Sequence, residues 1–186
     1  MQQAPGILQV LQGKFGSKIL SSDMSVLDPT ITVEGDSIAE ICSFLKSNEA
    51  LAFDTLMCLS AVDYKGLKGE TDRIELVYHL FSMKHRHQIV LKVLLPREEP
   101  SIPSVEQIWD IANWHEREAY DMFGVTFNGH TDLRRILCPD DWVGYPLRKD
   151  YVQPETYRGM PVAPGKQFVE MAQDGLQVGT DPFREG

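Results

Sequence analysis

The chain has 186 residues, of which 42% are hydrophobic and 24% charged, enough for one globular domain with a real core and an additional extended segment. Its formal net charge of −9 argues against nucleic acid as a partner, because surfaces that bind nucleic acid are basic. No apolar run approaches the roughly 20 residues of a membrane-spanning helix. The N-terminus has neither a secretory signal nor an organellar transit pattern. We therefore expect this chain to reach a membrane only through partner proteins.

The three cysteines are Cys42, Cys58 and Cys138, an odd number at wide spacing. This pattern argues against a disulfide framework and fits a reducing cytoplasm. It also argues against a self-contained iron–sulfur cluster, which needs four cysteines with some of them close in sequence. We expect that the chain itself transfers no electrons.

The first third of the chain predicts alternating helices and strands. Residues 7–15 have apolar side chains at helical spacing, and the β-branched residues 30–33 predict a strand. Asp36 is the expected N-cap of a helix whose apolar stripe runs through residues 38–45. Residues 50–63 fit either a helix or a strand, although Ala61 to Tyr64 favour a strand.

The middle of the chain predicts a hairpin and a long helix. Residues 73–83 and 87–95 alternate apolar and polar side chains around a tight connection at residues 84–85, which indicates two antiparallel strands with one buried face. Pro96 ends the second strand. A helix is expected from Ser104, as its N-cap, to Phe123, and Gly124 ends it.

This order of elements predicts an α+β fold: a small, largely antiparallel sheet with helices on one face. We place the globular domain at residues 1–124 and an extended, partner-binding segment at residues 125–186. Six of the eleven prolines lie between Pro139 and Pro182, and no hydrophobic period is sustained there. Such a tail cannot close a core of its own, and its aromatic residues indicate that a partner holds it in place.

The stretch from Trp114 to Tyr151 combines charges and aromatic rings more densely than any other part of the chain. Buried ions need partners, so this mixture predicts ion pairs at a surface that another protein covers. The helical period puts Glu116 on the apolar side, where Arg134 or Arg135 is the natural partner; the alternative is that Glu116 lies at the margin and reaches water. The candidates for structural ion pairs and for the partner interface are Glu116, Arg117, Glu118, Asp121, His130, Arg134, Arg135, Trp142, Arg148, Lys149 and Asp150.

Other kinds of site are less well supported by this stretch. His115, Glu118 and His130 allow a metal-site hypothesis, but two ligands three residues apart are a weak signal, and ion-paired structural residues are the favoured interpretation. A basic patch for an anionic lipid or nucleotide is opposed by equally numerous acidic residues nearby. No catalytic triad, phosphate loop or dinucleotide-binding glycine motif is present. We therefore assign no catalytic, cofactor-binding or metal-binding residue.

The runs EREAYDMFGVTFNGHTDLRRIL and DWVGYPLRKDY resemble the signature of the 30-kDa subunit (the C subunit in bacteria) of proton-pumping NADH:quinone oxidoreductase, respiratory complex I. A weaker resemblance extends back to the residues AVDY at positions 61–64. Two positions depart from the pattern. Thr131 stands where the family usually has proline, and Tyr145 stands where bacterial members often have histidine.

The resemblance implies a non-catalytic scaffold subunit of the peripheral arm, at the cytoplasmic face of a bacterial cell membrane. It implies packing on the 49-kDa (D) subunit, beside the cluster-bearing B subunit, with the tail across the 49-kDa subunit. The complex uses NADH, FMN, iron–sulfur clusters and quinone, none of them bound by this chain. The alternatives are the equivalent subunit of a membrane-bound hydrogenase or of a cofactor-420 dehydrogenase and, in a different class, a stand-alone metalloenzyme.

Overall fold

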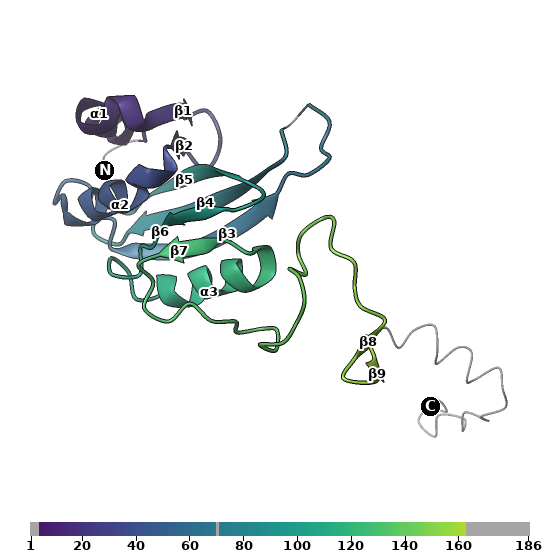
Figure 1. Cartoon of the computed structure of the whole chain (residues 1–186). Helices are drawn as coiled ribbons and strands as arrows, with labels where there is room; N and C mark the ends of the chain where they lie inside the picture. The colour runs from purple at the N-terminus through teal and green to yellow at the C-terminus, as the bar shows by residue number, and fades with distance from the viewer. Residues whose placement is uncertain (1–3, 70, 163–186) are drawn as a thin grey trace, which may run out of the picture. The chain divides into compact units, whose positions relative to one another are not determined.

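The computed structural model describes residues 4–69 and 71–162 (Figure 1). The chain divides into two units, Met1–Tyr151 and Val152–Gly186. The described part of the second unit contains a short antiparallel hairpin of β8 (Thr156–Tyr157) and β9 (Met160–Pro161). Residues 163–186, the C-terminal part of the tail that we expect a partner to hold, lie outside the described residues.

A five-stranded sheet forms the centre of the first unit (Figure 1), in the order β1-β2-β5-β4-β3. Neighbouring strands are antiparallel except β2 and β5, which are parallel. The expected α+β class with a largely antiparallel sheet is therefore confirmed. The strands are β1 (Ile19–Asp23), β2 (Thr30–Val33), β3 (Thr55–Asp63), β4 (Arg73–Ser82) and β5 (His87–Pro96).

Three helices, α1 (Ala4–Phe15), α2 (Ile38–Ser47) and α3 (Ala112–Phe123), bury one face of this sheet. Their apolar side chains join one hydrophobic cluster with the alternate residues of β4 that are fully buried, such as Leu76 and Leu80. The intervening residues of β4, such as Val77, are only partly buried, except for Glu75, which is 4% exposed. The alternation in the sequence thus correctly identified the core face of the hairpin.

Two predicted helix starts are wrong. Asp36 caps no helix: a 3₁₀ turn, η2 (Gly35–Ser37), precedes α2, and the Ile38 N–H donates to the Gly35 carbonyl, so no side-chain cap is used. Helix α3 begins at Ala112 rather than after Ser104. The backbone near Ser104 instead continues a parallel pair of short strands, β6 (Ser101–Pro103) and β7 (Thr126–Asn128), which the sequence did not predict.

The end of α3 agrees with the prediction, because Gly124 closes the helix with a left-handed φ of 73°. The ambiguous stretch at residues 50–63 resolves as strand β3. The chain after Gly124 remains in contact with the first unit: β7 pairs with β6, and the Leu147 N–H donates to the Met122 carbonyl at 3.2 Å. The first unit therefore extends to Tyr151, whereas the sequence places a boundary at Gly124. The hydrogen bonds that hold this extension are made by individual polar groups. Such contacts produce no hydrophobic period in the sequence, so the extension could not be predicted from it.

Candidate functional site

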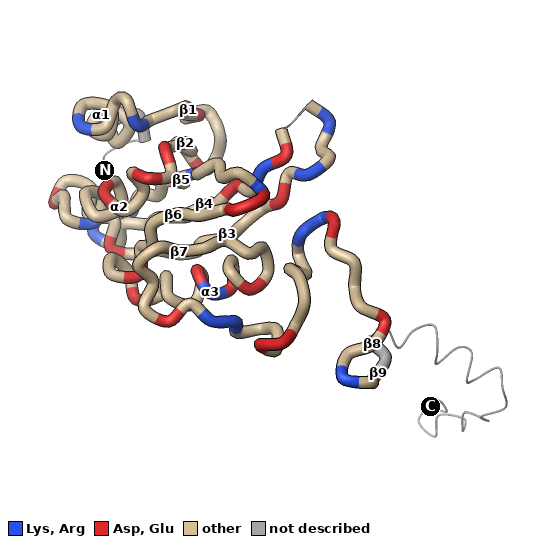
Figure 2. Tube along the Cα trace, in the orientation of Figure 1, with Lys and Arg blue, Asp and Glu red and all other residues tan. Residues whose placement is uncertain are grey.

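The candidate site is the segment 130–151, which follows β7 and passes the C-terminal end of α3 (Figure 1). Blue and red residues alternate along it in Figure 2. Buried carboxylates of the globular part fix its backbone. Asp121 and Asp63 contact the segment directly, and Glu116 secures the loop that precedes α3.

Asp121 is fully buried and anchors the first half of the segment. Its carboxylate accepts a hydrogen bond from Arg135 Nη1 at 2.7 Å. It also accepts the main-chain N–H groups of Ile136 at 3.0 Å, Leu137 at 2.7 Å and Cys138 at 2.9 Å. Burial by itself would raise the pKa of Asp121, but these donors together lower it below its ordinary value. Asp121 is therefore an ionised anchor for three consecutive peptide groups.

Arg135 extends this anchor toward the second half of the segment. Its Nη2 donates to the Gly144 carbonyl at 3.1 Å, and its guanidinium lies 5.5 Å from the centre of the Tyr145 ring. Arg148 contacts the same ring at 4.8 Å, and its Nε donates to the Phe123 carbonyl at 2.7 Å. This cation at the C-terminal end of α3 also interacts favourably with the helix dipole. Tyr145 thus lies against two arginines at the helix end.

Gly124 is the position where the ring of Tyr145 comes closest to the backbone. A Cβ at Gly124 would lie 2.5 Å from the Tyr145 ring, and its φ of 73° already disfavours any other residue. We expect Gly124→Ala to lower the free energy of unfolding by about 3 kcal/mol in denaturant titrations. Gly129→Ala is the matched control: its φ is 86°, but nothing lies within 4 Å of the added methyl, so about 1 kcal/mol is expected. Equal losses in the two variants would contradict the close approach of Tyr145.

Asp63, at the end of β3, anchors the far end of the segment. Arg97 donates to its two carboxylate oxygens, from Nε at 3.0 Å and Nη2 at 2.9 Å, and the side chain of Asp63 is only 1% exposed. The main-chain N–H groups of Lys149 and Lys65 donate to the same carboxylate at 2.9 and 3.0 Å. Burial would raise the pKa of Asp63, but Arg97 and the two N–H groups lower it to about 2.

Arg97 also binds the carboxylate of Asp150, and Lys65 Nζ contacts that carboxylate at 2.9 Å. Hydrogen bonds from Arg97 and Lys65 hold the pKa of Asp150 well below its usual range. Arg97 was not predicted from the sequence, and Asp63 entered only as part of a resemblance. The strand order could have indicated this pair. Strands β3 and β5 both run antiparallel to β4, so their C-terminal ends lie at the same end of the sheet.

Glu116 is fully buried, as predicted, but the expected ion pair with Arg134 or Arg135 is wrong. Its carboxylate instead accepts the hydroxyl of Ser104 at 2.6 Å and the N–H of Val105 at 2.7 Å. Burial raises the pKa of Glu116, and the two donors only partly oppose this effect. Both arginines are bound by aspartates instead. Arg135 binds Asp121, and Arg134 binds the exposed Asp132 in its own loop.

Three further predicted residues also have internal partners. Arg117 is nearly buried, donates from Nε to the Arg134 carbonyl at 3.2 Å, and lies over the ring of Trp114 at 5.2 Å. Arg134 is exposed, and its Nε donates to Asp132 at 2.9 Å. Trp142 donates from Nε1 to the hydroxyl of Tyr151 at 3.0 Å. The rings between the charges therefore take part in the internal contacts of the segment.

His130 begins the segment and is bound on both ring nitrogens. Nε2 lies 3.3 Å from the Asn113 carbonyl, and Nδ1 accepts the Asp132 N–H at 3.0 Å. The next residue, Thr131, donates its N–H to Glu106 at 2.8 Å and its hydroxyl to the same carboxylate. The proline that the resemblance leads one to expect at position 131 lacks this N–H. The departure at Thr131 therefore adds a contact instead of weakening the turn.

The hypothetical metal ligands do not converge. His115 and Glu118 line a cavity beside β3, whereas His130 contacts the Asn113 carbonyl and Glu106. Among the described residues, no three histidine, cysteine, aspartate or glutamate side chains are grouped closely enough to hold a metal ion. Over the same residues, no helix is long and apolar enough to cross a membrane.

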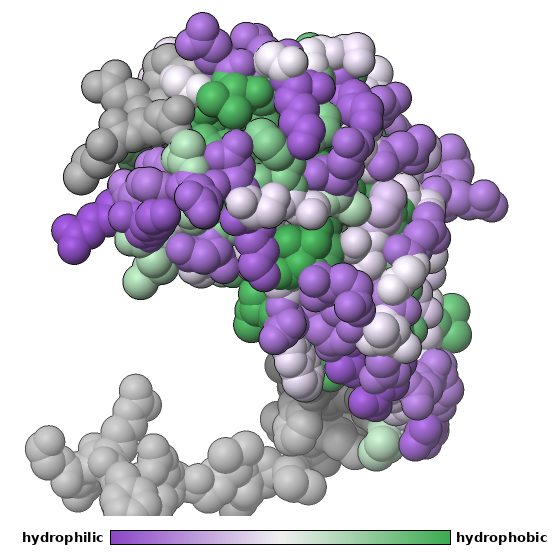
Figure 3. Space-filling model, turned by 90° about the vertical axis from the view of Figure 1, so that its left-hand side faces the viewer, coloured by the Kyte–Doolittle hydropathy of each residue, from purple (hydrophilic) through white to green (hydrophobic). Residues whose placement is uncertain are grey.

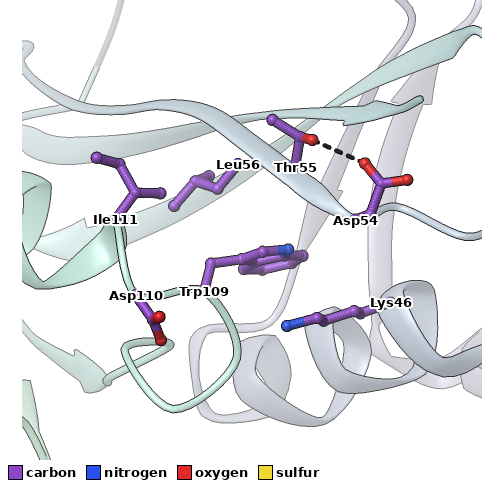
Figure 4. Close-up of a pocket in the computed structure, with 7 residues that line it drawn as sticks. All are labelled: Lys46, Asp54, Thr55, Leu56, Trp109, Asp110 and Ile111. Atoms are coloured by element: carbon purple, nitrogen blue, oxygen red, sulfur yellow. Dashed lines mark hydrogen bonds between the residues drawn. The ribbon is translucent and has the colours of Figure 1, made fainter.

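A separate hollow of about 380 Å³ lies between α2, the start of β3 and the loop before α3 (Figure 4). Most of its polar lining groups are already bonded within the fold. Lys46 Nζ donates to the Ile108 carbonyl, Trp109 Nε1 donates to the Phe53 carbonyl at 3.3 Å, and Asp54 accepts the Thr55 hydroxyl at 2.7 Å. We therefore treat this hollow as part of the packing between elements rather than as a binding site.

The family model described as "Respiratory-chain NADH dehydrogenase, 30 Kd subunit" matches residues 31–157, more than half of the chain. The chain belongs to this family. The match begins at β2 and includes the whole segment 130–151 with its anchors Asp63, Arg97 and Asp121. The resemblance seen in the signature residues is thereby confirmed.

Curated relatives in this 30-kDa subunit family are named as the C subunit of NADH-quinone oxidoreductase. The relative from Chloroherpeton thalassium is 48% identical over 156 residues, which are 83% of this chain and 63% of the relative. The relative from Chlorobium phaeobacteroides is 43% identical over 164 residues, 87% of this chain and 96% of the relative. The chain thus spans less than two thirds of the first relative and almost all of the second.

Two solved structures resemble the fold. A trypsin-resistant fragment of Nqo5 superposes with a TM-score of 0.59 at 27% identity, covering 68% of this chain and 98% of the fragment. A chain of an archaeal membrane-bound sulfane sulfur reductase superposes with a TM-score of 0.65 at 22% identity, covering 97% of this chain and 96% of that one. The second likeness concerns the fold alone.

Proposed function

We propose that this chain is a non-catalytic scaffold subunit in the peripheral arm of a proton-translocating NADH:quinone oxidoreductase. In this proposal it packs on the 49-kDa (D) subunit, beside the cluster-bearing B subunit, at the cytoplasmic face of the bacterial cell membrane. NADH, FMN, iron–sulfur clusters and quinone are then bound by other subunits, and this chain supports electron transfer by keeping those subunits in register. Membership of the 30-kDa subunit family and the relatives named as C subunits support this assignment.

One observation about the segment 130–151 supports the proposal most strongly. Main-chain N–H groups of the segment donate to the buried carboxylates of Asp121 and Asp63, so its backbone is held without a partner. Its exposed positions include three apolar side chains: Leu137 is 63% exposed, Val143 81% and Leu147 53%. A rigid backbone that presents apolar side chains to solvent is the arrangement expected of a preformed protein–protein interface.

On the face of the molecule seen in Figure 3, apolar areas lie between hydrophilic ones and form no continuous band. Such a mixture is common to subunit interfaces and to other protein surfaces. It differs from the broad apolar belt with which a protein enters a lipid bilayer.

The test is an affinity pull-down of the tagged chain from gently solubilised membranes, with the co-purifying chains identified. We expect a 49-kDa-type subunit together with flavin- and cluster-bearing NADH-oxidising subunits. The double variant Leu137→Asp, Val143→Asp should reduce this recovery at least tenfold, since charged groups in an apolar contact are costly. Leu27→Asp is the matched control, because Leu27 is 93% exposed but lies outside the segment, and it should not change recovery.

Other results of the same pull-down would overturn the proposal. Recovery with nickel-containing hydrogenase subunits or with cofactor-420 dehydrogenase subunits would move the chain to one of those complexes. Purification of the wild-type chain alone would reject the scaffold role, and its metal content would then test the stand-alone metalloenzyme. Unchanged recovery of the double variant would place the interface elsewhere on the molecule.

A further inference from the structure

A cavity of about 230 Å³ lies between the edge strand β3 and helix α3, which are neighbours in Figure 1. Its outer rim reaches solvent, because Glu118 is exposed and Leu147 is 53% exposed. Its volume is below the roughly 300–1,000 Å³ of small-molecule pockets and suits a single large side chain. The lining residues are Cys58, Leu59, Ser60, Ala61, His115, Glu118, Ala119, Phe123 and Leu147.

The wall of this cavity is mostly apolar and well supported. Leu59 and Ala119 are each only 3% exposed and belong to the hydrophobic core, and Phe123 packs against that core. A concave apolar wall that is backed by the core keeps its conformation when a side chain fills the cavity. The entering side chain therefore gains the free energy of burial, and little conformational entropy of the wall is lost. Pockets of this kind receive the anchor residues that dominate protein–protein binding energies.

The rim of the cavity supplies a charge. Helix α3 contains three acidic residues, and two of them, Glu116 and Asp121, are saturated by internal donors. The side chain of the third, Glu118, has no hydrogen bond or ion pair with any other described residue. The side chain of the neighbouring rim residue His115 likewise makes no contact of these kinds within residues 4–69 and 71–162. An unpaired carboxylate beside an apolar hollow favours a cation on whatever covers it.

We propose that this cavity receives one large aliphatic or aromatic side chain of a partner subunit, and that an adjacent arginine or lysine of the same partner segment binds Glu118. The inference rests on the proposed scaffold function and deepens it by naming the partner chemistry of one site. The cavity is continuous with the segment 130–151 through Leu147, which lines the cavity and is one of the exposed apolar residues of that segment. A single partner surface therefore covers both.

Cys58 provides a direct probe of occupancy, because it lines the cavity and is partly exposed. The rate of its alkylation by N-ethylmaleimide is measured by peptide mass spectrometry in the free chain and in the assembled complex. We expect assembly to slow alkylation of Cys58 at least tenfold. Cys42, which is fully buried and whose thiol pKa is raised by burial, should stay unreactive in both states and provides an internal reference. An unchanged rate at Cys58 would overturn the inference.

Two variants test the apolar and charged parts separately. Ala61→Leu fills the cavity, and Glu118→Lys reverses the charge at its rim; each should reduce recovery of the partner at least tenfold. Glu49→Lys, at an exposed carboxylate outside the cavity, is the control and should not change recovery. Thermal unfolding of each free variant confirms that it folds, and Glu118→Lys, at an exposed position, keeps the test valid if Ala61→Leu does not fold.

The possible failures are distinguishable. If the wild-type chain recovers its partners and both variants recover them equally well, the cavity is not an anchor site, and the scaffold function stands. If the wild-type chain recovers no partner, both proposals are rejected together.

Discussion

Replacing Asp121 by alanine is expected to lower the free energy of unfolding by about 4 kcal/mol. The substitution leaves Arg135 without the carboxylate that it binds at 2.7 Å, and leaves three consecutive N–H groups without their acceptor. Removing one member of a buried ion pair typically costs about 3–5 kcal/mol, and unsatisfied buried donors add to the loss. Denaturant unfolding at neutral pH measures the effect.

The control for this prediction is Asp132→Ala. Asp132 also pairs with an arginine, Arg134, but the two side chains are 53% and 67% exposed, so Asp132→Ala should leave the free energy of unfolding nearly unchanged. Hydrogen exchange distinguishes a local effect from a global one: in Asp121→Ala, the amides of Ile136, Leu137 and Cys138 should exchange faster than those of β4. If Asp121→Ala and Asp132→Ala cost the same, Asp121 does not anchor the segment.

Local periodicity was sufficient to predict the hairpin, because ten-residue strands such as β4 alternate over enough positions to identify their core face. It was insufficient for β6 and β7, which have three residues each and show no period. The start of α3 was misassigned for a related reason. Ser104 has the residue type of a helix N-cap, and its hydroxyl does accept the Glu106 N–H at 3.1 Å, but it heads a turn and donates to Glu116.

The sequence singled out residues of this segment as candidates, but it did not predict which groups inside the chain bind them. The helical period correctly placed Glu116 on the buried side of α3, yet it gives no information on which donor reaches it. The downstream arginines Arg134 and Arg135 were the expected partners, but the donors proved to be a hydroxyl and an N–H group from the loop before α3. The Asp63–Arg97 pair was missed because its residues are separated by 34 positions and meet only through the strand order.

These contacts divide the residues of the segment 130–151 into two groups. Most of its charged side chains and ring donors bind within the chain, as Arg135, Arg148 and Trp142 do. The apolar side chains at positions 137, 143 and 147 are exposed. The charges therefore determine the shape of the segment, while the apolar residues provide the surface that a partner can cover. This division explains how a segment without a core of its own is held against the globular part of the chain.

The dependence of stability on pH tests the second anchor, Asp63. Its pKa is about 2 in the folded protein and 3.8 in the unfolded reference, so the folded state binds fewer protons between these values. The resulting stabilisation, about 2 kcal/mol, is fully present above the unfolded pKa and is lost as the pH falls through the folded pKa. The lowered pKa of Asp121 adds a further loss of stability in acid. The raised pKa of Glu116 has the opposite effect, because it lowers stability as the pH rises above 4.5.

We expect Asp63→Asn to lower the free energy of unfolding by about 3 kcal/mol at pH 7, because Asn keeps the shape of the side chain but loses the ion pair with Arg97. The difference between wild type and variant should be constant from pH 7 to pH 5 and should shrink steadily from pH 4 to pH 2. Asp36→Asn, at an exposed carboxylate, is the control and should leave the profile unchanged. A difference that stayed constant down to pH 2 would mean that Asp63 contributes through packing alone, and the charge of the Asp63–Arg97 pair would then not be what holds Lys149 and Asp150 in place.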